Sequence, residues 1–358
     1  MIRDRLSRLR DFLREKKADA VVVSKEVNLH YFSGFRGDDT LLLISPDDAL
    51  LTTDSRYTEQ AAEQAPLFEV IEQKDGLWAK AAECAKAHGW KKLAFEGNAM
   101  LYDTFVKFGE LLGSGAALAV PVHLDALREV KEAEEIAAMK KAAEIGDAAF
   151  SDIVKCIRPG ISEREVAARL EGTMRALGSE RPAFATIVAS GARGSLPHGI
   201  ATEKLIVSGE FVTMDFGAVY EGYHSDMTRT VCVGTASEEQ RALYRTVLLA
   251  QKLGVSLVKP GASGRAVDAA VRKNLADAGY GEYFGHGLGH SLGLEIHEEP
   301  RLSKKSDCES LLPNMIVTVE PGVYLPGKCG IRIEDTVLVT ETDGVPLTKS
   351  GKELMEIN

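Results

Sequence analysis

Apolar and polar residues alternate along the first 112 residues in a way that predicts helices and strands in turn. The first segment carries apolar residues at helical spacing among charged ones, which predicts an amphipathic helix with the face Ile2, Leu6, Leu9 and Leu13. Five short apolar runs predict strands, at 20–24, 40–44, 49–53, 68–72 and 92–97. Helical spacing returns between them at 56–65, where Asp54 is expected to open the helix, and at 78–89 and 101–112. This alternation is typical of an α/β domain.

Residues 113–127 interrupt the alternation with small residues and Pro121, which predicts a linker. Helical spacing resumes at 131–157, where one face carries Ile136, Met139, Ala143 and Gly146. We therefore predict two domains, residues 1–124 and residues 125–358.

The second domain contains a weak internal repeat. Residues 158–168 and 259–269 read RPGISEREVAA and KPGASGRAVDA, and they match at Pro, Gly, Ser, Arg and Val with an offset of 101 positions. Each segment predicts a turn, a serine N-cap and a helix. Turn and cap signals also recur by chance, so this repeat alone decides little.

A second repeated motif makes chance a poorer explanation. VTMDFG (212–217) and VTVEPG (317–322) share Val-Thr-x-acid-x-Gly, and an acid-x-Thr follows each, beginning at Asp226 and at Glu334. The sequence therefore predicts two related halves, each with two carboxylates on neighbouring strands.

The first hairpin can be followed residue by residue. A two-residue turn at 221–222 would place Asp215 opposite Thr228 and Asp226 opposite Gly217. Asp215 and Asp226 would then be diagonal neighbours on one face of the sheet, roughly 7 Å apart at Cβ. This arrangement suits two carboxylates that converge on a metal ion.

Composition and charge narrow the possible partners. The 358 residues include 43 Lys and Arg against 53 Asp and Glu, a formal net charge of -10, which disfavours nucleic acid as a partner. Five scattered cysteines without a CxxC pair favour a reducing cytoplasm. The sequence shows neither a signal-peptide core nor a run of membrane-spanning length, so we expect neither export nor a membrane partner.

The repeated acids predict a metal site. Four negative charges gathered among apolar strand residues would be energetically unfavourable, and two divalent cations would neutralise them. The four carboxylates are Asp215, Asp226, Glu320 and Glu334. For any single one of them, a structural salt bridge is the alternative. The glycines of EYFGHGLGHSLGLEIHEEP (282–300) argue against a helical HExxH zinc site, and His290 is the candidate fifth ligand. Oxygen ligands with one imidazole suit Mn²⁺, Co²⁺, Fe²⁺ or Zn²⁺.

Several segments, in their order and spacing, resemble the pita-bread metallopeptidases of family M24, in particular the Xaa-Pro aminopeptidases and the Xaa-Pro dipeptidases (prolidases). The segments are DFGAVYEGYHSDMTRT, GHGLGHSLGLEIHEEPR, TVEPGVY, GIRIEDTVLV and SLPHG. The N-terminal GFRGDDTLLLI and DSRYTEQA resemble a creatinase-type domain. The resemblance implies an α+β protein, with an α/β creatinase-type N-terminal domain before a duplicated, creatinase/aminopeptidase-like pita-bread catalytic domain, and it implies a homodimer.

The resemblance also implies roles for individual residues. The ligands of two divalent ions would be Asp215, Asp226, His290, Glu320 and Glu334, with Asp226 and Glu334 bridging. Glu320 would also serve as general base, while His198 and His297 would stabilise the tetrahedral intermediate or help to protonate the leaving nitrogen. Ser291 departs from the glycine of many relatives, and a small residue should be tolerated there.

Four further residues are expected at the substrate side. His286 would line the proline side of the pocket, and Tyr324 would contact the substrate. Arg301 would hold the terminal carboxylate of the substrate, with a surface ion pair as its alternative. Arg332 lies two residues before Glu334, on the same strand face, and is expected to partner the acidic ligands beside the substrate.

The expected reaction is the hydrolysis of Xaa-Pro bonds in short proline-containing peptides by a hydroxide shared between two ions. We expect the two ions to be Mn²⁺ or Co²⁺, with Zn²⁺ and Fe²⁺ as alternatives. Two other functions stay open. A methionine aminopeptidase-like enzyme shares the metal site but generally lacks a domain like residues 1–120. A non-catalytic pita-bread binding protein would have lost metal ligands, whereas all five are present in this sequence.

Overall fold

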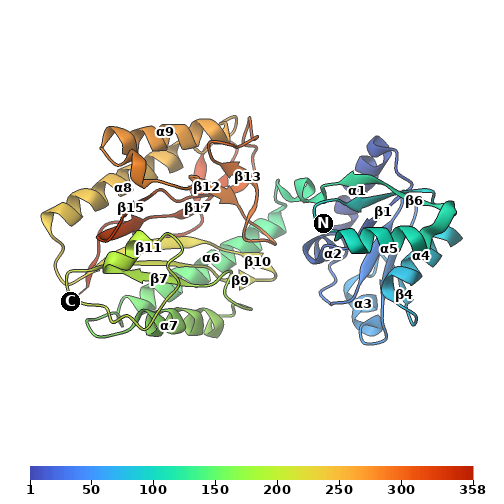
Figure 1. Ribbon diagram of the computed structural model, residues 1–358, viewed down its shortest axis with the longest axis horizontal. Helices are drawn as coiled ribbons and strands as arrows, with labels where there is room; N and C mark the ends of the chain where they lie inside the picture. The colour runs from blue at the N-terminus through green and yellow to red at the C-terminus, as the bar shows by residue number, and fades with distance from the viewer. Residues whose placement is uncertain (358) are drawn as a thin grey trace. The chain divides into compact units, whose positions relative to one another are not determined.

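The N-terminal unit is built on one mixed β-sheet. The computed structural model describes residues 1–357 and divides into two units, Met1–Arg128 and a second that begins at Glu129 (Figure 1). The sheet has the strand order β4-β3-β2-β1-β5-β6, in which β2 runs antiparallel to β1 and β3 and the other pairs are parallel. Its elements are α1 (Ile2–Lys16), β1 (Ala20–Val23), α2 (Glu26–Ser33), β2 (Leu41–Ile44), β3 (Ala49–Thr53), α3 (Thr58–Gln64), β4 (Glu69–Glu72), α4 (Leu77–Ala87), β5 (Lys92–Glu96), α5 (Tyr102–Leu112), η1 (Gly113–Gly115), β6 (Ala117–Val122) and η2 (Leu124–Arg128).

Most of the predicted elements of this unit are confirmed. The five predicted strands correspond to β1–β5, and α1 buries Leu6, Leu9 and Leu13. The predicted start of α3 is wrong by several residues, because the Asp54 carboxylate accepts a hydrogen bond from the Arg56 backbone in a turn and Tyr57 occupies the N-cap. The short helix α2 was not predicted.

The predicted linker at 113–127 is wrong. β6 pairs in parallel with β5 and forms the edge of the sheet. Pro121 fits an edge strand because its missing N–H can face away from the neighbour. The predicted domain boundary after residue 124 falls inside η2, where the buried Arg128 guanidinium contacts the Asp125 carboxylate.

The second unit contains two successive sets of helices and strands. The first set packs α6 and α7 against a sheet of the order β19-β11-β8-β7. Its elements are α6 (Ala133–Ile153), α7 (Glu163–Ala176), β7 (Ile187–Ser190), η3 (Gly191–Ser195), β8 (Phe211–Phe216), β9 (Val219–Tyr220), β10 (Tyr223–His224) and β11 (Met227–Val233). The helix predicted at 131–157 is therefore confirmed as α6, with slightly shorter bounds.

The second set packs α8 and α9 against a sheet of the order β13-β12-β14-β17-β18. Its elements are α8 (Glu238–Leu257), α9 (Gly264–Asp277), η4 (Gly281–Tyr283), β12 (Gly289–Ser291), β13 (Glu298–Leu302), β14 (Ile316–Val319), β15 (Gly322–Leu325), β16 (Cys329–Arg332), β17 (Asp335–Val339) and β18 (Gly344–Pro346). The last strand, β19 (Glu356–Ile357), returns to the sheet of the first set and pairs with β11. Within this unit, α8 and α9 cover one side of the strands, and α6 and α7 cover the other (Figure 1).

The predicted internal repeat is confirmed in local detail. Ser162 and Ser263 are the N-caps of α7 and α9, and each hydroxyl accepts a hydrogen bond from a backbone N–H of the first turn. Gly160 and Gly261 precede them with φ of 89° and 84°, a left-handed conformation that glycine adopts without a steric cost. The two halves therefore start their second helices in the same way.

The helices of the second unit reach 21 residues in α6, yet none of the helices within residues 1–357 combines the length and apolarity that crossing a membrane requires.

Candidate metal centre

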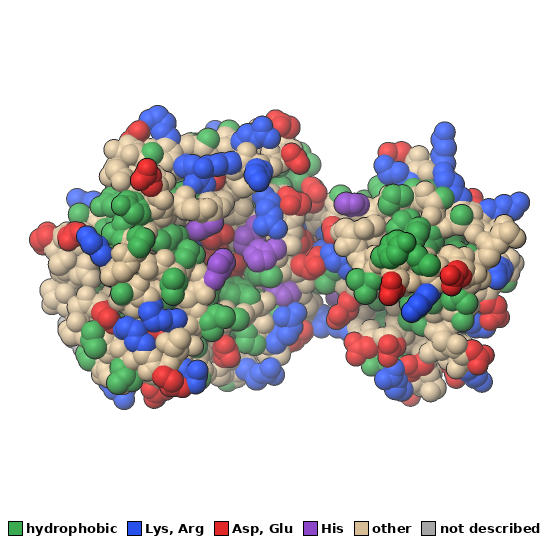
Figure 2. Space-filling model, viewed as in Figure 1, with side chains coloured by type: hydrophobic (Ala, Val, Ile, Leu, Met, Phe, Trp, Pro, Cys, Tyr) green, Lys and Arg blue, Asp and Glu red, His purple; other side chains and the backbone are tan. Residues whose placement is uncertain are grey.

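A cavity of about 680 Å³ opens in the second unit between its two halves. Histidine side chains gather on the face of this unit shown in Figure 2. The residues that line the cavity are Phe184, Ala185, Ile187, Pro197, His198, Ile200, Asp215, Asp226, His286, Gly287, Gly289, His290, Ile296, His297, Arg301, Ser303, Glu320, Arg332 and Glu334. All five predicted metal ligands and all four histidines singled out in the sequence thus border one space.

Three carboxylates form the centre of this site. One oxygen from each of Asp215, Asp226 and Glu334 lies within 4.8 Å of the corresponding oxygens of the other two. Asp215 comes from β8, Asp226 directly precedes β11, and Glu334 lies between β16 and β17. Acids from both halves of the unit therefore meet, as the repeat predicts.

The first hairpin has the predicted register. Tyr220 pairs with Tyr223 across the turn, and Asp215 pairs with Thr228. The turn residues Glu221 and Gly222 have φ of 50° and 81°, as a two-residue hairpin turn of the I′ type requires. This short turn fixes which face of the sheet Asp215 and Asp226 share.

The second hairpin brings its two acids opposite one another. Val319 pairs with Asp335 on one side of the interruption, and Gly322 pairs with Arg332 on the other. The same register places Glu320 across from Glu334. Thr228 then joins the two halves, because its hydroxyl donates to the Glu334 carboxylate at 2.7 Å and its carbonyl accepts from the Glu334 backbone N–H at 3.1 Å.

The acids are in an environment that opposes their ionisation. Burial raises the pKa of Asp226 and of Glu334 well above the ordinary value, and neighbouring carboxylates raise it further. Burial also raises the pKa of Glu320 to about 8. The Oδ1 atoms of Asp215 and Asp226 are buried without a hydrogen-bond partner. Buried oxygens that lack hydrogen-bond partners and lie close to other carboxylates form a donor set that fits divalent cations.

His290 is oriented as a metal ligand would be. The residue lies in β12, and the Nδ1 atom of its ring is 3.0 Å from the Ser291 carbonyl oxygen, which fixes Nδ1 as the protonated nitrogen. Its Nε2 is 3.6 Å from a carboxylate oxygen of Asp226 and 3.6 Å from one of Glu320. Burial lowers the pKa of His290 to about 3, so the Nε2 lone pair stays available.

Arg332 binds the acid cluster at Asp215. Its guanidinium donates to the Asp215 carboxylate at 2.6 Å, to the Thr228 hydroxyl at 3.0 Å and to the Tyr324 hydroxyl at 2.7 Å. Tyr324 in turn is 2.8 Å from Nε2 of His286. Tyr324 is not among the cavity-lining residues, so it reaches the cavity through His286 and Arg332.

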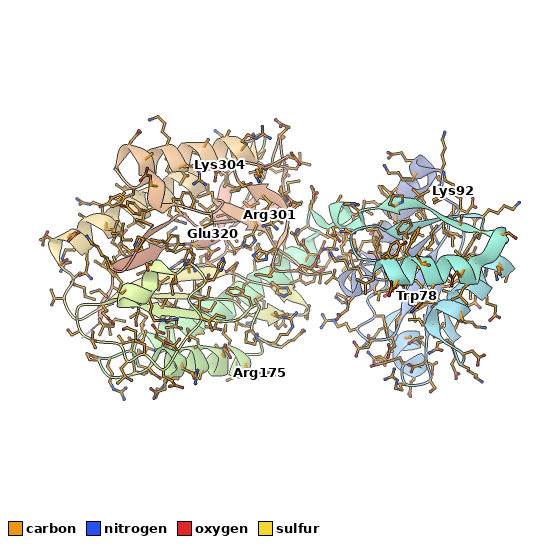
Figure 3. The ribbon with its side chains drawn as sticks, viewed as in Figure 1. Trp78, Lys92, Arg175, Arg301, Lys304 and Glu320 are labelled. Carbon is orange, nitrogen blue, oxygen red and sulfur yellow. The ribbon has the colours of Figure 1, made fainter. Side chains whose placement is uncertain are left out.

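The remaining candidates lie around the cavity. His286 is neutral at ordinary pH because burial lowers its pKa to about 4. His198 and His297 have exposed rings, and the His297 ring packs edge-to-face on that of His290 at 4.5 Å. Arg301 pairs with His290 across β12 and β13, and its Nε lies 3.3 Å from a carboxylate oxygen of Glu299. Figure 3 labels Arg301 and Glu320, which both border the cavity.

Sequence reasoning missed the apolar wall and the hydroxyls that hold the acids. Phe184 and Ile187 line the cavity but lie in a segment without a recognisable pattern, and Ile296 lines it from within the histidine-rich segment, where only the polar residues were considered. Thr318 donates to Glu320 at 3.3 Å and accepts the backbone N–H of His290 at 3.1 Å. The repeated Val-Thr-x-acid motif contains this threonine, so the repeat was the signal that could have identified it.

Comparison with known proteins agrees with this geometry. Residues 137–341 match Metallopeptidase family M24, and residues 5–130 match the Creatinase/Prolidase N-terminal domain. The chain is 40% identical over 356 residues to the Xaa-Pro dipeptidase of Pyrococcus furiosus, covering 99% of this chain and 100% of that protein.

Solved structures show the same similarity. The Xaa-Pro dipeptidase from Bacillus anthracis has a TM-score of 0.96 and 43% identity, covering 99% of this chain and 100% of that one. The X-Pro aminopeptidase from Thermotoga maritima has a TM-score of 0.90 and 38% identity, covering 98% and 99%. These matches confirm the predicted fold, a creatinase-type N-terminal domain followed by a pita-bread catalytic domain. Because the family match spans residues 137–341 and relatives of 40% identity are covered over their full length, the chain belongs to metallopeptidase family M24, a membership that implies divalent metal ions.

Proposed function

We propose that this protein hydrolyses the peptide bond that precedes proline, as an Xaa-Pro dipeptidase or an Xaa-Pro aminopeptidase. The observation that carries the proposal is the cluster of Asp215, Asp226 and Glu334, with two orphaned buried oxygens, at the wall of a cavity of about 680 Å³. This volume is in the range of sites for small ligands, roughly 300–1,000 Å³. Relatives named for Xaa-Pro hydrolysis support the substrate class.

We propose that two divalent ions, Mn²⁺ or Co²⁺ before Zn²⁺ or Fe²⁺, are held by Asp215, Asp226, His290, Glu320 and Glu334. When bound, such ions polarise a carbonyl group and lower the pKa of water, which supplies a nucleophile at neutral pH. The four carboxylates would give the charge that two such ions need, and the neutral His290 would add one nitrogen ligand.

Glu320 is proposed as the general base. Its carboxylate lies at the cavity wall, and in its ionised form it can take a proton from the attacking water. The leaving nitrogen of proline has no N–H and departs only when it is protonated, and Glu320 would return the proton to it. His198 and His297, both at the cavity, are proposed to stabilise the oxyanion or assist this transfer.

Substrate orientation is proposed to depend on the cationic and aromatic residues around the cavity. The half-exposed Arg301 would hold the free carboxylate of a dipeptide. His286 would border the proline ring, with Tyr324 fixing the imidazole by their 2.8 Å contact. Arg332 would keep Asp215 in place through their 2.6 Å contact.

A panel of peptides tests the proposal. The purified protein is assayed with Mn²⁺ or Co²⁺ on Ala-Pro, Ala-Pro-Ala, Ala-Ala and Met-Ala-Ser, with the metal content measured in parallel. We expect cleavage of the proline peptides, little cleavage of Ala-Ala, and two ions per chain. The ratio of Ala-Pro to Ala-Pro-Ala turnover separates a dipeptidase from an aminopeptidase. Activity confined to Met-Ala-Ser, or clearly fewer than two ions after reconstitution, rejects the assignment.

The role of Arg301 has its own control. Arg301→Ala should raise the KM for Ala-Pro by roughly tenfold or more, because a charge-assisted hydrogen bond to the carboxylate is lost. Ala-Pro-amide lacks that carboxylate and should be cleaved almost equally by both forms. An equal loss on both substrates contradicts this role.

We further propose that the protein acts in the cytoplasm as a homodimer, without nucleic acid or membrane partners. All five cysteines are free, as a reducing compartment would leave them. Light scattering coupled to size exclusion tests the assembly, since a monomer of 38.7 kDa at micromolar concentration would overturn the dimer.

A further inference from the structure

A buried carboxylate lies outside the metal centre and has an unusually large set of partners. Glu163 is the first residue of α7, and its side chain is 0% exposed. It neither lines the cavity nor belongs to the acid cluster. A buried charge persists only when hydrogen bonds and a counter-charge offset its desolvation.

Each oxygen of this carboxylate binds a different part of the chain. Oε1 accepts the backbone N–H and the hydroxyl of Ser190, both at 2.8 Å. Oε2 accepts the backbone N–H of Thr202 at 3.1 Å and its hydroxyl at 2.8 Å. The Arg193 guanidinium supplies the counter-charge. One side chain thereby joins the residues on either side of the segment 191–201.

The segment 191–201, which we name the His198 loop, contributes Pro197, His198 and Ile200 to the cavity. The middle of the loop is loosely packed, since Leu196 and Ile200 are 52% and 59% exposed, although Gly194 lies close to Gly330 and the Pro197 carbonyl accepts a hydrogen bond from Arg332 at 3.2 Å. Arg193 makes a second contact across the loop, to the Ile200 carbonyl at 2.8 Å. Polar contacts that converge on Glu163 thus help to set the position of His198.

Helix capping does not explain Glu163. The N-terminus of α7 already has a capping box, in which the Ser162 hydroxyl accepts the Glu165 N–H and the Glu165 carboxylate accepts the Ser162 N–H at 2.9 Å. Beside it, Lys204 donates to the Ser190 hydroxyl at 2.8 Å and pairs with Glu210 at 2.7 Å, which extends the network around the base of the loop.

We propose that Glu163 is a positioning residue, which holds the His198 loop so that the His198 imidazole stands at the substrate cavity. The inference rests on the proposed function only where it concerns catalysis by His198. The restraint of the loop by Glu163 is independent of it.

Trypsin tests the restraint without any assay of activity. Arg193 is followed by Gly194, so a released loop offers a cleavage site, whereas the folded protein keeps the Arg193 guanidinium on Glu163. Glu163→Gln should accelerate cleavage after Arg193 roughly tenfold, as expected for the loss of a charge-assisted hydrogen bond that opposes local opening. Glu165→Gln on the same helix is the matched control and should leave this rate unchanged.

A double-mutant cycle tests the catalytic part. Glu163→Gln should lower kcat/KM for Ala-Pro by roughly 10- to 100-fold, because a displaced catalytic group costs a factor of this size. In the His198→Ala background the same change should cost less than about twofold, since the group that Glu163 positions is already gone. Bound metal should stay as in the wild type.

The outcomes separate the possibilities. If Glu163→Gln lowers activity equally in both backgrounds, or leaves cleavage after Arg193 unchanged, the positioning role is wrong. If the wild type does not cleave Ala-Pro, or His198→Ala is fully active, the proposed function of the site or of His198 fails, while the trypsin result still decides whether Glu163 holds the loop. Should Glu163→Gln not fold, Thr202→Val removes one donor to Oε2 and should shift both measurements in the same direction by a smaller factor.

Discussion

Asp226 and Glu334 are expected to lower the stability of the metal-free protein and to raise the stability of the metal-bound protein. Without a cation they share a buried space with two other acids, and burial raises the pKa of each. With a divalent ion bound as proposed, the same oxygens would become ligands. The sign of their contribution to stability therefore depends on metal.

Asp226→Asn should weaken that dependence. Removing one charge relieves repulsion, so the metal-free variant should be more stable than the metal-free wild type by about 1–2 kcal/mol. Wild type should gain about 3 kcal/mol from metal at 100 times its dissociation constant, and the variant clearly less. Urea unfolding followed by circular dichroism, with and without Mn²⁺, measures both effects. The exposed Glu341→Gln serves as control, and a metal-free variant less stable than wild type contradicts the argument.

His30 is a partly buried titratable group in the N-terminal unit, remote in sequence from every proposed ligand. Burial, followed by the positive charges of Arg36 and Arg5, lowers its pKa from 6.5 to about 4. Its Nδ1 is buried without a hydrogen-bond partner. The folded protein thus keeps this imidazole neutral at pH values at which the unfolded chain protonates it.

The free energy of unfolding should therefore fall as the pH drops from about 6.5 to about 4, because the unfolded state binds the additional proton. The loss from His30 alone is at most about 3 kcal/mol. Urea unfolding at pH 7 and pH 5 measures it by tryptophan fluorescence, since the only two tryptophans, Trp78 and Trp90, are in this unit. His30→Gln should weaken the pH dependence, and the exposed His123→Gln should not. An unchanged slope in His30→Gln assigns the dependence to other groups.

Helices α7 and α9 begin alike, but the glycines inside α7 and α8 have opposite surroundings. A Cβ added at Gly172 in α7 would meet nothing within 4 Å. A Cβ at Gly254 in α8 would lie 2.6 Å from Cγ1 of Val319, a stiff side chain of β14 that directly precedes Glu320. Helix propensity favours alanine at both positions, and packing opposes it at one.

Gly172→Ala should stabilise the protein by about 0.5–1 kcal/mol. Gly254→Ala should destabilise it by about 1–3 kcal/mol because β14 must shift. Each variant serves as the control for the other in urea unfolding followed by circular dichroism. Stabilisation by Gly254→Ala would mean that the α8–β14 contact yields more easily than its distances imply, and destabilisation by Gly172→Ala would contradict the argument from helix propensity.

The two units differ in their relation to metal. Every proposed ligand lies in the second unit, whereas both tryptophans lie in the first, where Figure 3 labels Trp78. Metal binding raises the free energy of unfolding of the unit that binds the ion.

Chelation should therefore destabilise only the second unit. Hydrogen exchange should accelerate in β8, β11, β14 and β17 after removal of metal and stay unchanged in β1–β5. The urea midpoint followed by tryptophan fluorescence should also stay unchanged. A shift of that midpoint on chelation would show that the two units unfold together.

Local patterns in the sequence determined much of this protein. The register of the first hairpin followed from a two-residue turn and side-chain alternation, and Asp215 does pair with Thr228. The serine caps of α7 and α9 followed from matched turn motifs. Such features depend on neighbouring residues only. The strand β6 was missed because its small residues and Pro121 are typical of a linker, whereas only the tertiary structure places this apolar run at the edge of a sheet, where proline is tolerated.

Only the tertiary structure decided what surrounds each acid and histidine. The motifs predicted that Asp226, Glu320 and Glu334 meet. The 2.7 Å contact from Thr228 to Glu334 and the carboxylate that ties Ser190 to Thr202 came from the fold. Such contacts join residues far apart in the chain, and they depend on how two hairpins and two helices pack together. Spacing along a sequence can state which residues share a face, whereas the distance between faces is set by packing.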